Sequence, residues 1–187
     1  MEVELAFILG SMEDGCLTKR ESIGDYTIEF DQKNREWLEE VSKCFKVVFN
    51  KTSSIKTTKR GFFRLRIHSK EIFQKIENLL ERREELIENS SLECKMKFLR
   101  GVFDSESSVH RKRFVIALSN KNTNLLKFCK NLLQGFNIKT GSICKSNKDV
   151  FEFCIFGRDN LKKFRERVGF SHPDRKRKLD ELLKMSH

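Results

Sequence analysis

The sequence predicts an α+β protein built from two pseudo-symmetric halves, each with the element order αββαββα and one four-stranded antiparallel sheet. Three observations predict this class. The same order of helical and strand-like segments occurs twice in the 187 residues. Apolar and polar residues alternate in several strands, as in "FFRLRIHS". Each half also begins with an apolar helix that ends in acidic residues. We therefore divide the chain into residues 1–85 and 86–187.

In the first half, apolar residues at positions 5, 8, 9 and 12 have the i, i+3, i+4, i+7 spacing of a helix. Asp14-Gly15 follows, and the glycine is expected to end this helix in the left-handed conformation. The later elements are expected at residues 16–21 and 25–32 (strands around a turn at Gly24-Asp25), 33–49 (helix), 53–58 and 62–69 (strands), and 70–87 (helix).

The second half has the same order. We expect a helix over about residues 92–104, strands at 107–111 and 113–120, a helix at 123–136, strands at 140–146 and 150–157, and a helix at 158–168. The charged segment 82–91 joins the halves. The stretches "IEFDQKN" and "IALSNKN" both end a strand and enter a helix, which puts Gln32 and Asn120 at equivalent places.

Composition narrows the class of partner. The net charge is +11, from 38 basic and 27 acidic residues, and favours a polyanion, nucleic acid first and an anionic membrane surface second. The six cysteines form no C-x-x-C pair, so reduced thiols are expected and a zinc site is not. The acidic start and the lack of a long apolar run predict an intracellular protein without a membrane partner, cytoplasmic in a prokaryote or located in an organelle.

One face of each sheet is expected to be basic and polar, and broad enough to lie along a duplex. In residues 62–69, arginine and histidine side chains alternate with apolar ones, which places them on the open face. The nucleic-acid-binding candidates are Lys19, Arg20, Lys56, Arg64, Arg66, His68, Arg111, Arg113 and Lys145.

The stretch "FLRGVFDSESSV" resembles the LAGLIDADG motif of homing endonucleases, and "LAFILGSMEDG" in the first half is similar but less regular. The resemblance covers the whole chain, because the tail "VGFSHPDRKRKLDEL" is similar to the segment that closes many family members. Two motifs, one in each half, are typical of the single-chain type. The resemblance implies a pseudo-dimer whose two sheets form a DNA-binding saddle.

The resemblance also implies that the two motif helices pack side by side at the centre of the molecule. Small residues at i, i+4 spacing would let their backbones approach closely. These helix-interface residues are Ala6, Gly10, Gly101 and Ser105.

By the same resemblance, Asp14 and Glu106 are the catalytic acids and bind two or more Mg²⁺ or Mn²⁺ ions at the interface between the halves. The first motif is one residue shorter than the second, from its glycine to its acid, so Glu13 is an alternative to Asp14. Asp104 is expected to be a structural carboxylate of the motif.

Four further residues match positions near the cleavage site of family members. Gln32 and Asn120 are expected near its water network, with turn or cap residues as the other interpretation. Arg175 and Lys176 are expected near the scissile phosphates, where a cation stabilises developing negative charge; the other interpretation is a solvated charge run.

The expected function is a site-specific, metal-dependent DNA endonuclease that makes a double-strand break at a long asymmetric site and acts as a monomer on double-stranded DNA. The alternative is a nuclease-inactive relative, either an RNA maturase that binds intron RNA or a sequence-specific DNA-binding protein. The sequence specifies neither the target site nor the host, nor whether the gene is intron-encoded or free-standing.

Overall fold

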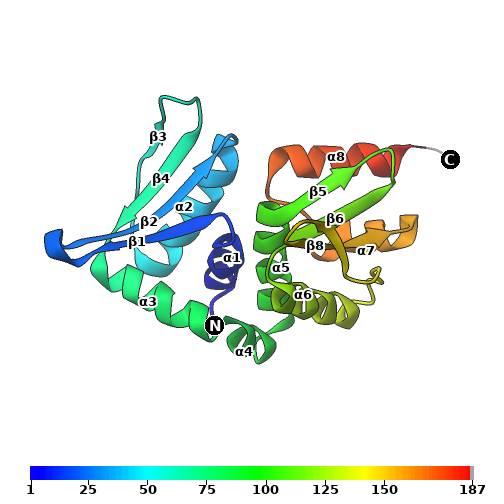
Figure 1. The fold of residues 1–187 in the computed structure, drawn as a ribbon, viewed down its shortest axis with the longest axis horizontal. Coiled ribbons are helices and arrows are strands. Elements are labelled where there is room, and N and C mark those ends of the chain that lie inside the picture. The colour runs from blue at the N-terminus through cyan, green and yellow to red at the C-terminus, as the bar shows by residue number, and fades with distance from the viewer. Residues whose placement is uncertain (186–187) are drawn as a thin grey trace. The chain divides into compact units, whose positions relative to one another are not determined.

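The computed structural model describes residues 1–185, coloured by residue number in Figure 1. The chain divides into two compact units, Met1–Gly101 and Val102–His187. The division falls inside one helix and marks where the packing changes. The boundary predicted at residues 85 and 86 marks the sequence repeat, and it stays a prediction. No helix within residues 1–185 is both long and apolar enough to cross a bilayer.

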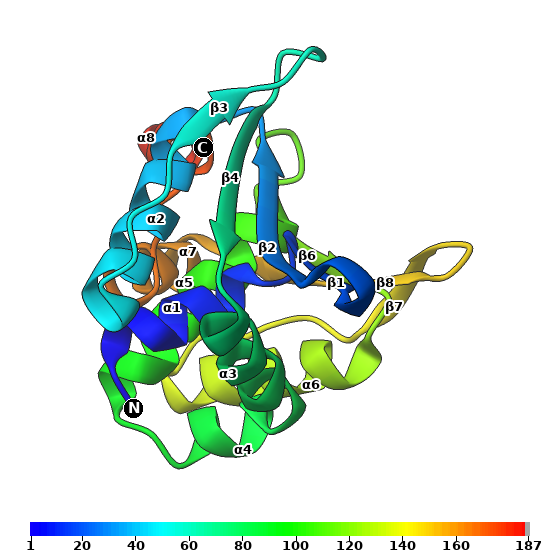
Figure 2. The same ribbon diagram turned by 90° about the vertical axis from the view of Figure 1, so that its left-hand side faces the viewer.

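The first unit contains one antiparallel sheet with the strand order β1-β2-β4-β3. Figure 2 shows β4 beside β2. Its elements are α1 (Val3–Ser11), β1 (Gly15–Arg20), the short 3-10 helix η1 (Glu21–Ile23), β2 (Asp25–Gln32), α2 (Arg35–Phe49), β3 (Ile55–Thr57), β4 (Phe63–His68), α3 (Lys70–Glu81) and α4 (Arg83–Glu88).

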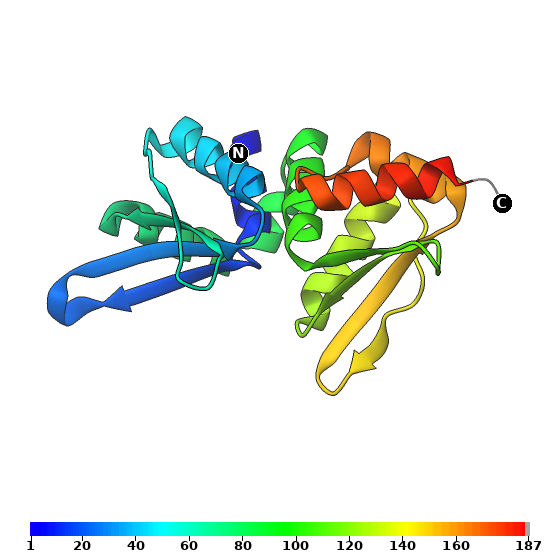
Figure 3. The same cartoon turned by 90° about the horizontal axis from the view of Figure 1, so that it is seen from above.

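The second unit repeats this topology, with the strand order β5-β6-β8-β7. The remaining elements are α5 (Leu92–Glu106), which begins in the first unit, then β5 (Ser107–His110), β6 (Val115–Asn120), α6 (Thr123–Gly135), β7 (Cys144–Asn147), β8 (Val150–Phe156), α7 (Arg158–Arg167) and α8 (Pro173–Lys184). In Figure 3, α8 lies against β5. The predicted α+β fold with two four-stranded antiparallel sheets is confirmed.

Aromatic side chains form the core between each sheet and its helices. In the first unit, the Phe30 ring of β2 packs edge-on against Trp37 and Phe45 of α2, with ring centroids 6.2 and 6.3 Å apart. In the second unit, Phe103 of α5 contacts Phe153 of β8 and Phe164 of α7. These rings are fully or almost fully buried, so each sheet has one covered and one open face.

The helix predicted over residues 70–87 is wrong as a single helix. The chain turns at Arg82, where φ is −113° and ψ is 17°, and α4 begins at the next residue. This turn brings the guanidinium of Arg83 to the end of α1, 3.4 Å from the Leu9 carbonyl oxygen and 2.6 Å from a Glu13 carboxylate oxygen. The helix α8 was absent from the predicted order and extends the second half beyond αββαββα.

The role predicted for Gly15 is also wrong. Gly15 does not have the positive φ that Gly24 and Gly61 show, and it begins β1 instead of ending α1 in the left-handed conformation. A Cβ atom at Gly15 would lie 2.8 Å from Cε of Met12 and 2.9 Å from Cε1 of Phe30. The glycine therefore makes room for these two side chains.

Candidate active site and nucleic-acid interface

Strand register places Asp14 and Glu106 at equivalent positions of the two units. Asp14 directly precedes β1, and Glu106 directly precedes β5. The first residue of β1 pairs with Phe30 of β2, and the first residue of β5 pairs with Leu118 of β6. Because both acids enter the same strand of the same topology, the register aligns Asp14, and not Glu13, with Glu106.

The same register aligns Gln32 with Asn120. Gln32 follows Phe30 by two residues, Asn120 follows Leu118 by two, and each is the last residue of its strand. Each also pairs with a phenylalanine of the next strand in its sheet. Gln32 pairs with Phe63, the first residue of β4, and Asn120 pairs with Phe151, the second residue of β8. The equivalence predicted from "IEFDQKN" and "IALSNKN" is confirmed.

In the first unit, the two neighbouring acids contact different elements: Asp14 is bonded to a residue of β2, and Glu13 to a residue of α4. The carboxamide nitrogen of Gln32 donates a hydrogen bond to Oδ2 of Asp14 at 2.6 Å. Glu13 pairs with Arg83 at 2.6 Å, and these two side chains are only 15% and 12% exposed. Glu13 is thus engaged in a half-enclosed ion pair with a cation, whereas the hydrogen bond from Gln32 leaves the charge of Asp14 uncompensated by that neutral donor.

In the second unit, a cavity of about 520 Å³ brings three predicted residues together, Glu106, Asn120 and Arg175. Oδ1 of Asn120 accepts a hydrogen bond from the amide of Asn122 at 2.8 Å, so this residue also shapes the turn into α6. Lys121, which sequence reasoning missed, lines the same cavity. The full lining is Ser105, Glu106, Ser107, Ser108, Ser119, Asn120, Lys121, Val150 and Arg175.

Backbone carbonyl groups hold Arg175 at the edge of this cavity. Its Nε donates to the Ser107 oxygen at 2.8 Å, and its Nη2 donates to the Ser105 oxygen at 3.0 Å. Both acceptors flank Glu106, so the cation is fixed beside the acid. Lys176 is exposed and does not line the cavity, because the next residue of a helix points about 100° away.

Asp104 has the structural role that was expected of it. It is fully buried and accepts hydrogen bonds from the backbone amides of Ser171, at 3.1 Å to each oxygen, and His172, at 3.0 Å. These bonds fix the start of α8 and so the placement of Arg175. Burial first, and then the charge of Arg175, lowers the pKa of His172 to about 4.

Gly101 lies against the backbone of α1 within the first unit. A Cβ atom there would be 2.5 Å from the Phe7 oxygen, 2.7 Å from the Ser11 nitrogen and 2.9 Å from the Gly10 carbonyl carbon. No side chain fits in this space, which explains a glycine at this place of α5. The other helix-interface candidates, Ala6 and Ser105, are buried.

The nucleic-acid-binding candidates of the first unit do not all share a face. Cα partners in an antiparallel sheet lie on the same face, so Lys56, Arg64, Arg66, His68 and Arg20 share the open face. Lys19 pairs with Tyr26, whose ring contacts Phe73 of α3 at 5.5 Å between centroids. Lys19 therefore lies on the helix side of the sheet, and its contact with nucleic acid stays a prediction.

This open face carries both signs of charge and is not simply basic. Arg64 forms a two-pronged pair with Asp31, and Arg66 pairs with Glu29. Arg20 lies 3.0 Å from Asp25. Sequence reasoning missed these carboxylates, although they alternate along β2 in "DYTIEFDQ".

None of the second-unit candidates is a strand residue of its open face, although the guanidinium of Arg113 reaches Glu152 and Cys154 on that face, at 3.8 and 3.7 Å. Arg111 and Arg113 are in the turn between β5 and β6, where they pair with Glu181 and Glu152 respectively. Lys145 is the Cα partner of Phe151 and so shares the other face of the sheet. Two of the three candidates therefore lie in a hairpin turn, and the third lies on a strand with its side chain on the helix side.

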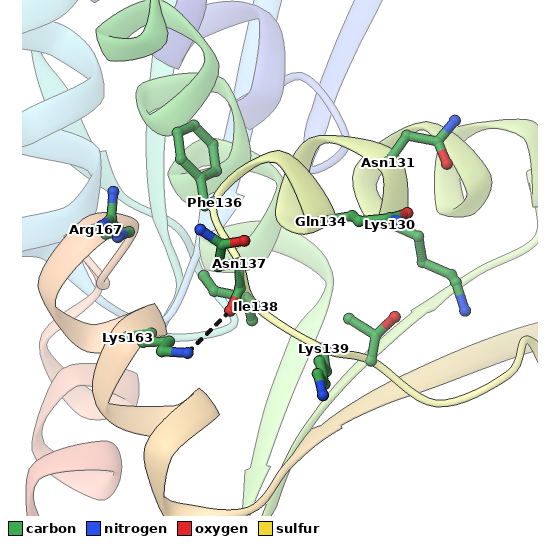
Figure 4. A pocket seen from close by; sticks show the side chains of 10 residues that line it. Lys130, Asn131, Gln134, Phe136, Asn137, Ile138, Lys139, Lys163 and Arg167 are labelled. Atoms are coloured by element: carbon green, nitrogen blue, oxygen red, sulfur yellow. Dashed lines mark hydrogen bonds between the residues drawn. The ribbon is translucent and has the colours of Figure 1, made fainter.

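A second cavity, of about 780 Å³, lies between α6 and α7 (Figure 4) and contains none of the predicted residues. Two of its lysines donate hydrogen bonds to backbone carbonyl groups. Lys130 donates to the Gly141 oxygen, and Lys163 donates to the Asn137 oxygen at 3.3 Å. Both acceptors lie in the segment that follows α6, so these two cations hold that segment in place.

The chain belongs to the LAGLIDADG-like domain family. The sequence pattern of this family matches residues 2–81 and again residues 93–169. Both matched segments contain the acid, the four strands and the carboxamide described above. A curated relative, the homing endonuclease I-ApeI of Aeropyrum pernix, is 26% identical over 96% of this chain and 86% of its own length. These findings place the chain in a family that includes DNA endonucleases.

Solved structures share the fold. I-DmoI in complex with DNA and Ca superposes with a TM-score of 0.74 at 20% identity, over 96% of this chain and 97% of that one. DUF199/WhiA from Thermatoga maritima superposes with a TM-score of 0.65 at 19% identity, over 99% of this chain and 62% of that one.

Proposed function

We propose that the protein is a site-specific, divalent-metal-dependent DNA endonuclease that makes a double-strand break at a long asymmetric site. The observation that carries the proposal is the equivalence of Asp14 and Glu106 in strand register. Each unit supplies one carboxylate before its first strand and one carboxamide at the end of its second. The name of the relative I-ApeI, a homing endonuclease, supports the same activity.

Asp14 and Glu106 are the proposed metal-binding acids. Among residues 1–185, no group of three or more His, Cys, Asp and Glu side chains is placed to hold a metal ion. Mg²⁺ fits this sparse donor set, because proteins bind it through one or two carboxylates together with water and substrate phosphates. Mn²⁺ takes the same oxygen ligands, and I-DmoI has been crystallised with DNA and Mn. When bound, two or more such ions would activate water and stabilise the leaving oxygen.

The other residues of the site orient the acids or offer positive charge to a phosphate. Gln32 holds Oδ2 of Asp14 and so limits the rotation of that carboxylate. Arg175, fixed between the carbonyl groups of Ser105 and Ser107, supplies a positive charge for a phosphate that enters the cavity of Glu106. Asn120 lines the same cavity. A catalytic role for Lys176 stays a prediction.

Double-stranded DNA is the proposed partner, and the repeat within one chain makes a monomer the proposed active form. The second candidate is a nuclease-inactive relative that binds intron RNA or DNA. The short first motif favours it, because α1 ends at Ser11 and the acid follows in a turn, whereas Glu106 is the last residue of α5.

Purified protein, incubated with intron-flanking duplex DNA in Mg²⁺ or Mn²⁺, tests the proposal. We expect double-strand cleavage by the native chain, and none by Asp14→Asn or Glu106→Gln. Protein that binds the duplex and leaves it uncut in both metals would contradict the nuclease activity. Tighter retention of intron RNA than of DNA would favour the maturase.

A further inference from the structure

The two open sheet faces differ in chemistry at equivalent positions. In the first unit, the paired strands β2 and β4 place Asp31 beside Arg64 and Glu29 beside Arg66. In the second unit, the pair equivalent to Asp31 and Arg64 is Ser119 and Glu152. The pair equivalent to Glu29 and Arg66 is Ala117 and Cys154. The first face therefore carries two arginine–carboxylate couples between paired strand residues. In the second, Glu152 pairs instead with Arg113 of the turn between β5 and β6, at 3.8 Å, and the position equivalent to Arg66 holds Cys154.

The next position along the same strands shows the same contrast. His68 of the first unit is bound to Thr27 at 2.9 Å. Its counterpart, Phe156, pairs with Val115, and this apolar residue is 48% exposed. A large exposed phenyl ring on an open sheet face offers an apolar contact where the first unit offers hydrogen bonds.

An arginine–carboxylate couple suits a G·C pair better than it suits a phosphate. In the major groove, guanine presents two acceptors to an arginine, and the neighbouring cytosine presents an N4 donor to a carboxylate. A phosphate approaching Arg64 would meet the negative charge of Asp31, 2.6 Å from the guanidinium nitrogen. The arginine side chains are 32% and 48% exposed, and such solvated pairs contribute little stability, so a base edge can replace part of each pair.

We propose that the two sheets read different base pairs: the first reads G·C pairs through the couples Arg64–Asp31 and Arg66–Glu29, and the second reads thymine methyl groups through Phe156. The inference rests on the proposed function, because it requires that the sheets lie in the major groove of a duplex. It adds that the half-site under the first unit is G·C-specific and that the half-site under the second is read through apolar contact.

A binding selection tests the first half of this inference. The full chain selects from a library of randomised duplexes, with Ca²⁺ as the divalent ion, and the bound pool is sequenced. We expect Arg64→Gln and Arg66→Gln each to relax a G·C preference about tenfold at a few positions of one half-site. Asp31→Asn should weaken the preference for cytosine at the same base pairs, on the strand opposite the guanine. The matched control Lys43→Gln changes an exposed cation on α2, which covers the other side of the same sheet, and should leave the pool unchanged.

Uracil tests the second half, because it lacks only the C5 methyl group of thymine. The selected duplex with uracil in place of thymine should bind the native chain about fourfold more weakly, as expected for one methyl group. Phe156→Ala should bind the two duplexes equally well. Because Phe156 is exposed, this variant should fold as the native chain does.

Three results would overturn the inference. A uniform loss of affinity in Arg64→Gln and Arg66→Gln, with a smaller salt dependence and unchanged base preference, would assign both arginines to phosphates. Equal binding of thymine and uracil duplexes by the native chain would remove the methyl contact. Failure of the native chain to enrich any duplex would refute the proposed function itself, whereas the first two results would leave that function standing.

Discussion

The carboxamide of Gln32 donates a hydrogen bond to Oδ2 of Asp14 at 2.6 Å, although 18 residues separate them in the sequence. The contact exists because β1 and β2 pair in a register that brings the end of β2 beside the residue preceding β1. One oxygen of the proposed metal-binding acid is thus oriented by the sheet.

Replacing Gln32 with leucine should therefore slow cleavage without preventing DNA binding. The variant keeps the size of the side chain and removes the donor, so the Asp14 carboxylate gains rotational freedom. Loss of such an orienting contact costs roughly 10- to 100-fold in metal affinity or activity. The measurement is the cleavage rate as a function of Mg²⁺ concentration, and its half-maximal concentration should rise. An unchanged Mg²⁺ dependence would show that Gln32 does not position Asp14.

Replacing Gly101 with alanine should destabilise the first unit. The added Cβ would meet backbone atoms of α1 at 2.5 and 2.7 Å, and backbone atoms cannot rotate away. Overpacking of this kind costs about 1–3 kcal/mol or more. Urea unfolding measures it. Gly135→Ala is the matched control, because no atom lies within 4 Å of the added carbon in α6 and stability should not fall.

Asp104→Asn should loosen the start of α8 while leaving both sheets intact. The buried carboxylate accepts the amides of Ser171 and His172, and an asparagine would turn one NH₂ group toward these donors. Unsatisfied buried groups cost about 1–3 kcal/mol. Hydrogen exchange of these two amides should accelerate more than that of the β6 amides. Equal protection in the variant and the native chain would count against this role.

Stability should fall between about pH 6.5 and pH 4 because of His172. Burial lowers its folded pKa to about 4, so the unfolded chain binds the proton first as the pH falls, and protonation favours unfolding. The contribution is on the order of 1 kcal/mol between pH 7 and pH 5, once solvent screening is allowed for. His172→Gln should lose less stability over this range than the native chain, as measured by urea unfolding at both pH values. An equal loss in both proteins would exclude His172 as the source.

The sequence predicted most of the fold because its signals are local. Alternation in "FFRLRIHS" and helical spacing in "NREWLEEVSKCF" each arise within one element, and the repeat sets their order. The break at Arg82 had no proline or glycine to mark it, because it depends on the distant contact of Arg83 with Glu13. The helix α8 was missed as an element because its first turns read as a charge run.

The sequence suggested which residues belong to the candidate site, but not which contacts those residues make. Motif resemblance pointed to Asp14 and Glu106, with Glu13 as an alternative to Asp14, and the strand register aligns Asp14 with Glu106. The face on which Lys19 lies depends on one residue of register, since a shift by one reverses every side chain. The pairing of Arg64 with Asp31 depends on strands that are 33 residues apart, which no local pattern reveals.

The central claim is that Asp14 and Glu106, and not Glu13, are the acids of a DNA endonuclease. The most direct measurement compares single-turnover cleavage of one bound duplex in Mg²⁺ by the native chain and by Asp14→Asn, Glu106→Gln and Glu13→Gln. We expect the first two variants to bind the duplex and to cleave about 100-fold more slowly or not at all, since metal ions supply several kcal/mol of transition-state stabilisation. Glu13→Gln should cleave at a rate near the native one. Loss of cleavage in Glu13→Gln with activity retained in Asp14→Asn would contradict the account.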